Sequence, residues 1–169
     1  MRKVQATQSR SEVRKSFPPL GSLVPKERRS RDYVVIGVDP GETTGVCCFH
    51  GCELFDARQL KTKCFESAVE ELAGYISVNT PKVVSYEDYR VYAWESEKHK
   101  WAGLHTPQII GAVRTLCVLE EIECVGRMAQ AAKTFVTDEK LTAWGLYQRG
   151  MRHSRDAIRH AVYHLVFGK

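Results

Sequence analysis

Hydrophobic residues along the chain follow two different periods, and the first is that of β-strands. Tyr33–Asp39 is a run of apolar, mostly β-branched residues, which predicts a buried strand. Thr44–Phe49 and Cys52–Gln59 lie on either side of a His50-Gly51 turn, so we expect a three-strand antiparallel meander. The period then becomes helical, with apolar residues on one face at Phe65, Val69, Leu72 and Ile76.

The rest of the chain alternates between short apolar runs and longer helical patterns. Lys82–Glu87 and Ile122–Val125 predict two more strands. Further helices are expected to begin near Thr106, Thr137 and Ser154. A meander followed by alternating helices and strands predicts an α/β fold with a mixed five-stranded sheet flanked by helices.

Charge divides the chain into an arm and a body. Residues 1–31 hold nine Lys or Arg against Glu12 and Glu27, whereas residues 32–169 hold sixteen Lys or Arg against eighteen Asp or Glu. We therefore expect a flexible basic N-terminal arm at 1–31 and one folded domain at 32–169. Such an arm suits a polyanionic partner, although a solvated leader that binds nothing has the same composition. The polar start argues against a secretory signal, and no apolar run is long enough to span a membrane.

The six cysteines do not predict a metal site. None of them has the CxxC spacing of common zinc sites, and without a secretory signal we expect reduced thiols. Cys47 and Cys48 are neighbours on one strand, so their side chains should point to opposite faces of the sheet. No structural zinc is expected.

Three acidic residues occupy the ends of predicted elements. Asp39 ends the first strand, Glu87 ends the fourth, and Asp156 lies in the first turn of the last helix, three residues after His153. Carboxylates from separate segments that converge repel one another, and a divalent cation relieves the repulsion. Oxygen ligands favour Mg²⁺ or Mn²⁺. On the same helix, His160 and His164 fall in one polar stripe with Asp156, which lies at the edge of the core-facing side, and we expect the two histidines to be solvated.

The acidic segments, taken in order, resemble the RuvC family of Holliday junction resolvases, which have an RNase H-like fold. Val35-Ile36-Gly37-Val38-Asp39-Pro40-Gly41-Glu42-Thr43-Thr44-Gly45 is similar to the family's first catalytic strand. Ser85-Tyr86-Glu87 resembles its second acidic strand, and His153-Ser154-Arg155-Asp156-Ala157 resembles its C-terminal metal motif. The resemblance spans residues 33–167 and is nearest to compact phage-type members. It implies a protein of the bacterial host cytoplasm.

The resemblance implies a metal-dependent endodeoxyribonuclease that resolves four-way DNA junctions. Asp39, Glu87, His153 and Asp156 would be the catalytic and metal-binding residues for two Mg²⁺ ions, with Mn²⁺ as an alternative. Asp39 would bridge both ions, Glu87 would bind the ion nearer the leaving 3′ oxygen, and Asp156 with His153 would hold the other. The products would carry a 5′-phosphate and a 3′-hydroxyl.

Basic and aromatic residues around these motifs suit contacts to branched DNA. The expected nucleic-acid-binding residues are Tyr89, Arg90, Tyr92, Lys98, Lys100, Lys133, Lys140, Arg152 and Arg155. Two coordinated cuts require two sites, so the resemblance also implies a homodimer, with the helix at 106–120 as the dimer face.

Other functions remain open at this stage. A related RNase H-fold nuclease acting on flaps, DNA ends or RNA–DNA hybrids would need the same acids. A non-catalytic DNA-binding module on this fold would lack some of them, and here all are present. The sugar-kinase and actin superfamily also begins with a strand and a phosphate-binding turn, but it needs two large lobes, for which 169 residues are too few.

Overall fold

A computed structural model of the chain describes residues 16–61, 64–88 and 105–168. The strands are β1 (Val34–Asp39), β2 (Thr43–His50), β3 (Glu53–Lys61), β4 (Val83–Glu87) and β5 (Glu123–Arg127). The helices are α1 (Leu20–Leu23), α2 (Phe65–Asn79), α3 (His105–Leu119), α4 (Ala129–Phe135), α5 (Asp138–Ala143) and α6 (Arg152–Phe167), with a 3₁₀ turn, η1 (Lys26–Arg28). No helix within these residues is long and apolar enough to cross a bilayer.

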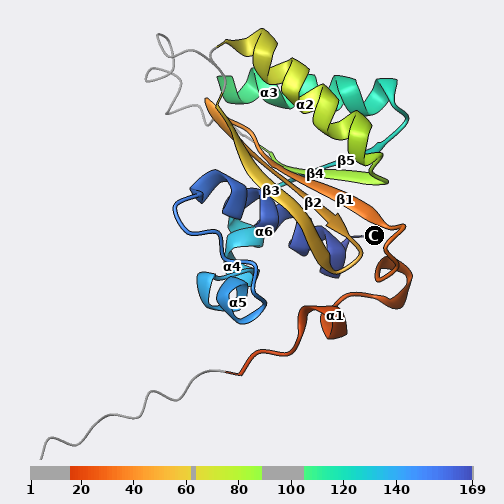
Figure 1. Ribbon diagram of the computed structural model, residues 1–169, viewed down its shortest axis with the longest axis vertical. Helices are drawn as coiled ribbons and strands as arrows, with labels where there is room; N and C mark the ends of the chain where they lie inside the picture. The colour runs from red at the N-terminus through yellow and green to blue at the C-terminus, as the bar shows by residue number, and fades with distance from the viewer. Residues whose placement is uncertain (1–15, 62–63, 89–104, 169) are drawn as a thin grey trace, which may run out of the picture.

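The five strands form one mixed sheet in the order β3-β2-β1-β4-β5. The β1, β2 and β3 strands pair antiparallel, while β4 pairs parallel with β1 and β5 parallel with β4. Helices α2 and α3 cover one face, and α6, with α4 and α5 outside it, covers the other (Figure 1). The α/β fold with a mixed five-stranded sheet flanked by helices, predicted from the sequence, is confirmed.

The sheet has a hydrophobic core on each face, and successive side chains of β1 point alternately into one and the other. Val34, Ile36 and Val38 pack with α2 and α3. Val35 packs on the α6 side. Asp39 therefore faces α6, because side chains two residues apart share a face. Cys47 and Cys48 also lie in different cores, as their alternation predicted.

Two glycines allow α6 to lie directly on the sheet. A Cβ at Gly37 would clash with the carbonyl oxygen of Ala157, and one at Gly45 would clash with the carbonyl oxygen of His153. Both partners are backbone atoms of α6, which cannot move aside as a flexible side chain could. These glycines therefore place the first turn of α6, with His153 and Asp156, over the end of β1.

The N-terminal segment differs from the expected flexible arm over residues 16–31. Leu20 and Val24 are buried in the core on the α6 side. Arg28 is 8% exposed and donates to the carbonyl oxygens of His164 (3.2 Å), Leu165 (3.3 Å) and Gly168 at the end of α6. The arginine is well placed there, because cations stabilise the C-terminal end of a helix. The few apolar residues of this segment stand among many charges without a helical or strand period, so composition alone predicts a flexible arm. Residues 1–15 lie outside the described part of the chain, so flexibility there stays a prediction.

Smaller differences concern element ends. The fifth strand runs one or two residues later than predicted, and α4 was not predicted because seven residues give little periodicity. Helix α5 was predicted correctly, with Thr137 as its N-cap accepting from the Lys140 backbone amide. Helix α3 already includes His105 and Thr106, and the residues before it are not described.

Candidate metal-dependent active site

Asp39 lies at the end of β1 beneath the start of α6 and is 8% exposed. Its Oδ2 atom is 2.8 Å from Nδ1 of His153. Burial, which the hydrogen bond from His153 opposes and the nearby charges of Glu87 and Asp156 reinforce, raises the pKa of Asp39 to about 6. Asp39 and Glu87 end neighbouring parallel strands, and Lys133 contacts both Glu87 and Asp156, so the three carboxyl groups share one site.

Glu87 ends β4, the parallel neighbour of β1, and its side chain also faces α6. Its Oε2 atom is 3.3 Å from Nε2 of His160 and 3.5 Å from Nζ of Lys133. The hydrogen bond from His160, followed by the charge of Lys133, lowers the pKa of Glu87 below its usual value. The pKa of Asp39 is therefore raised while that of Glu87 is lowered, and such opposite shifts are common where two acids have different roles.

Asp156 is 5% exposed in the first turn of α6, where the helix dipole favours an acid. Its Oδ2 atom is 3.4 Å from Nζ of Lys133, and its Oδ1 atom accepts from Arg159. Lys133 comes from α4, so its ammonium group lies between acids that belong to β4 and α6. The position of a cation between two of the three carboxylates is the main electrostatic feature of the site.

His153 stands at the start of α6, next to β1 and β3. Its backbone amide donates to Oε1 of Gln59 at 3.0 Å, and its side chain is 40% exposed. The backbone bond fixes the first turn of the helix, and the imidazole reaches Asp39 from the solvent side. The structure therefore brings Asp39, Glu87, Asp156 and His153, the four site residues expected from the sequence, to one end of the sheet.

The chemistry of this residue set fits a hard divalent cation. Three carboxylates and an imidazole meet at one place, and a positive charge already lies between two of the carboxylates. Within the described residues, however, no three His, Cys, Asp or Glu side chains stand in ready ligand geometry. Lys133 and Arg159 pair with the carboxylates instead, so a metal ion would have to displace Lys133 from between Glu87 and Asp156.

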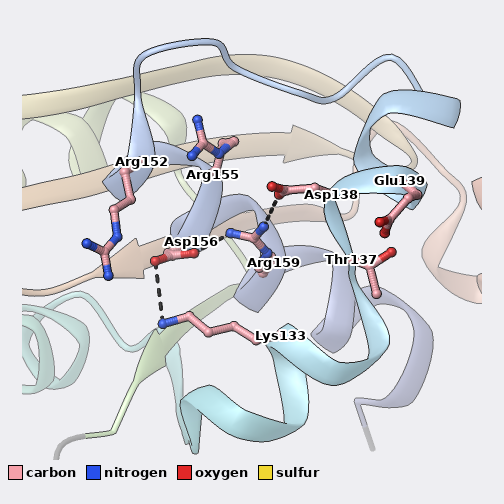
Figure 2. Close-up of a pocket in the computed structure, with 8 residues that line it drawn as sticks. All are labelled: Lys133, Thr137, Asp138, Glu139, Arg152, Arg155, Asp156 and Arg159. Carbon is pink, nitrogen blue, oxygen red and sulfur yellow. Dashed lines mark hydrogen bonds and ion pairs between the residues drawn. The ribbon is translucent and has the colours of Figure 1, made fainter.

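Part of the expected DNA-binding set lines a cleft beside Asp156. The cleft has a volume of about 460 Å³ and is lined by Lys133, Thr137, Asp138, Glu139, Arg152, Arg155, Asp156 and Arg159 (Figure 2). Lys140 is not among the residues that line this cleft, and its Nζ donates to the carbonyl oxygen of Phe135 at 2.7 Å. Tyr89, Arg90, Tyr92, Lys98 and Lys100 lie outside the described residues.

The expected solvation of the two histidines on α6 is wrong. His160 and His164 are both fully buried, since α6 packs against the sheet and the N-terminal segment covers its end. His164 lies 3.2 Å from the Tyr33 hydroxyl and 3.4 Å from Arg127. A helical period shows which positions are polar, but not whether other segments supply partners that allow burial. Sequence reasoning also missed the contacts of Arg159 and His160 with the acids, because no motif marks them.

Burial of His164 predicts a loss of stability in acid. Burial, followed by the charges of Arg127 and Arg28, lowers the pKa of His164 to about 4. Between the usual value of 6.5 and 4, the unfolded chain binds a proton at this position and the folded chain does not, so stability falls as pH falls. Relative to His164→Gln, the wild type should lose about 2–3 kcal/mol of unfolding free energy between pH 7 and pH 4. Urea unfolding at both pH values measures this, and equal losses in the two proteins would contradict it.

Comparison with known proteins relates the fold to one class. No protein-family model matches the chain, and no curated protein matches it. Thermus thermophilus RuvC in complex with a Holliday junction substrate superposes with a TM-score of 0.61 at 17% identity, over 78% of this chain and 91% of that one. A second Thermus thermophilus RuvC structure gives 0.59 at 18% identity, over 78% and 92%. Ydc2, the yeast mitochondrial Holliday junction resolvase, gives 0.50 at 14% identity, over 85% and 81%.

These similarities define the fold. The chain has the RNase H-like fold of RuvC and other Holliday junction resolvases, and the fold recognised from the three sequence motifs is confirmed. At 14–18% identity, function has to be argued from the site itself.

Proposed function

We propose that this protein is a metal-dependent, structure-specific DNA endonuclease that resolves four-way junctions. The observation that carries the proposal is the convergence of Asp39, Glu87 and Asp156, with His153 bonded to Asp39, at one end of a RuvC-type sheet. These acids come from three separate elements, and each would be costly to bury unless the group had a partner. Their shared site therefore supports a role in chemistry.

Asp39, Glu87, Asp156 and His153 would hold the divalent ions, two Mg²⁺ or Mn²⁺. Bound ions of this kind neutralise charge on the scissile phosphate and lower the pKa of an attacking water. The chain's own residues prepare the site, because His153 orients Asp39 while His160 and Lys133 keep Glu87 ionised. The expected products are a 5′-phosphate and a 3′-hydroxyl.

Branched DNA is the substrate that the surroundings of the site support best. Lys133, Arg152 and Arg155 line the cleft beside Asp156, where they would meet the phosphates of the cut strand. Tyr89, Arg90, Tyr92, Lys98 and Lys100, which follow Glu87 in the sequence and combine aromatic with basic side chains, are also expected to contact the junction. One of the solved structures that share this fold contains a Holliday junction substrate.

A homodimer would supply the two active sites that paired cuts require. At the end of α3, Val118 is 77% exposed and Leu119 is 72% exposed, which suits a face covered by a second copy. We expect Val118→Glu to raise the dissociation constant of the dimer at least tenfold, since a buried unpaired charge costs more than about 1.4 kcal/mol. Sedimentation measures this against Glu66→Gln on α2 as a control. A monomeric wild type would contradict the dimer.

The test of the proposal is cleavage of a labelled four-way junction, beside duplex, flap and RNA–DNA hybrid substrates of the same sequence. Each reaction is run with Mg²⁺, with Mn²⁺ and with EDTA. The expected result is a pair of symmetric nicks in the junction that require a divalent metal. If flaps, ends or hybrids are cut instead, the protein is a nuclease but the four-way junction is not its substrate. Junction binding without any cutting would indicate a non-catalytic DNA-binding module.

A further inference from the structure

Arg159 is almost completely enclosed one turn after Asp156 on α6. Its side chain is 11% exposed, and each side of its guanidinium group has a partner. Nη1 donates to Oδ1 of Asp156, Nη2 donates to Oδ1 of Asp138, and Nε donates to the carbonyl oxygen of Val136 at 3.0 Å. Figure 2 shows the side chain between the two aspartates, one on α6 and one on α5. A planar group held at three donors cannot rotate freely.

The contact with Arg159 engages one of the two carboxylate oxygens of Asp156 and fixes the orientation of the group. Oδ1 is occupied by the guanidinium group, while Oδ2 lies 3.4 Å from Nζ of Lys133, the cation that also contacts Glu87. Asp156 therefore presents a single oxygen toward the other acids. A carboxylate without the second contact could turn about its χ2 bond, which is soft for aspartate.

The charge of Arg159 is already balanced within the protein. Asp138 and Asp156 both pair with it, so it adds little net repulsion against an incoming cation and little attraction for a phosphate. Arg155, by comparison, lines the same cleft, donates to the carbonyl oxygen of Gln148 at 2.8 Å and lies over the Tyr147 ring, and among the described residues it has no carboxylate partner. The two arginines thus differ in their surroundings although they are four residues apart on one helix.

We propose that Arg159 is a positioning residue, which fixes Asp156 as a one-oxygen ligand for a divalent cation and is itself anchored by Asp138 and the Val136 carbonyl. The inference rests on the proposed function only in taking a divalent metal as the ligand of Asp156. In this arrangement Asp138 links α5 to Asp156 through Arg159, and none of the three sequence motifs includes this contact. Arg159 touches neither DNA nor the reacting atoms in this role.

The experiment is a thermal titration with Mn²⁺ in the absence of DNA, because a ligand that binds the folded state raises Tm. The full chain is compared with Arg159→Met, Arg159→Lys and Asp138→Asn. The Mn²⁺ midpoint is the Mn²⁺ concentration that gives half of the full rise in Tm. Removing a residue that orients a metal ligand typically costs roughly 10–100-fold in affinity, so the Mn²⁺ midpoint of Arg159→Met should rise by that factor. Arg159→Lys should restore part of the loss, and Asp138→Asn should give a smaller rise, roughly 2–10-fold.

Two further readouts separate positioning from other roles. Junction affinity in EDTA should be unchanged in all three variants, and cleavage should need more metal for its half-maximal rate. Arg58→Met is the matched control, since it removes an arginine paired with Asp56 on β3 and should leave the Mn²⁺ midpoint as in the wild type.

Any one of three results would overturn the proposal. The first is an unchanged or lower Mn²⁺ midpoint in Arg159→Met, and the second is a loss of junction affinity in EDTA in that variant. The third is a wild type that Mn²⁺ does not stabilise. If Arg159→Met does not fold, Arg159→Lys and Asp138→Asn decide, and both must raise the midpoint. A wild type that responds to Mn²⁺ but cuts no junction would reject the proposed substrate and leave the positioning role standing.

Discussion

Replacing Asp39 by asparagine is expected to lower the rate of metal-dependent cleavage by about a thousandfold or more, while DNA binding is retained. The asparagine side chain would keep an oxygen that can accept from His153, but it would lack the charge that draws a divalent ion to the site. Loss of a metal's contribution to the transition state is worth several kcal/mol, and about 4 kcal/mol corresponds to a thousandfold in rate. The measurement is single-turnover cleavage of the four-way junction with Mg²⁺.

The same variant should be more stable than the wild type when no metal is present. Because burial raises the pKa of Asp39 to about 6, the folded state holds an unfavourable charge at pH 7.5, which the substitution removes. The gain, about 2 kcal/mol, should be greatest above pH 6 and vanish below about pH 4, where both folded and unfolded states are protonated. Urea unfolding in EDTA measures it.

Asp32→Asn is the control for both effects. Asp32 is exposed and its side chain interacts with Ser30, outside the site. The Asp32→Asn variant should cut the junction and unfold in urea like the wild type. If Asp39→Asn cuts at the wild-type rate, Asp39 is no metal ligand. If Asp39→Asn is much less stable than the wild type in EDTA, its loss of cutting reports damage to the fold.

The second large effect is expected from Gly45→Ala. The new Cβ would clash with the carbonyl oxygen of His153, so the first turn of α6 must move away from β2. Overpacking of this kind costs about 3 kcal/mol, which lowers Tm by roughly 6–12 °C in a domain of this size. Asp156 and His153 would move with the helix, and a displacement of about 1 Å can cost on the order of a hundredfold in rate.

Gly74→Ala provides a control of opposite sign. Gly74 lies in α2 and a Cβ there would meet nothing within 4 Å. Alanine in a helix interior is favoured over glycine by about 1 kcal/mol, so Tm should rise by about 2–4 °C and cleavage should not change. Differential scanning calorimetry and the junction assay measure both variants. An unaltered Tm in Gly45→Ala would show that α6 does not lie against β2 as described.

Local pattern was sufficient for the strands and for the order of the acids. Asp39 and Glu87 each end an apolar run, and the strand period of two places their side chains on one face once β1 and β4 are neighbours. The pattern failed for Leu20, Val24 and Arg28, which pack on α6. Their burial depends on contacts more than a hundred residues away, with no local period to mark them.

The sequence by itself determined the α/β fold, the meander and the places of Asp39, Glu87 and Asp156 at the ends of elements, because these follow from residue type and spacing within short segments. The candidate roles of these acids and of His153 came from the resemblance of the ordered motifs to the RuvC family. Only the tertiary structure decided which cations accompany the acids. Lys133, Arg159 and His160 reach them from α4 and α6, at distances set by how closely the helix packs on Gly37 and Gly45. Side-chain partners across elements depend on packing in three dimensions, and no spacing along one chain encodes them.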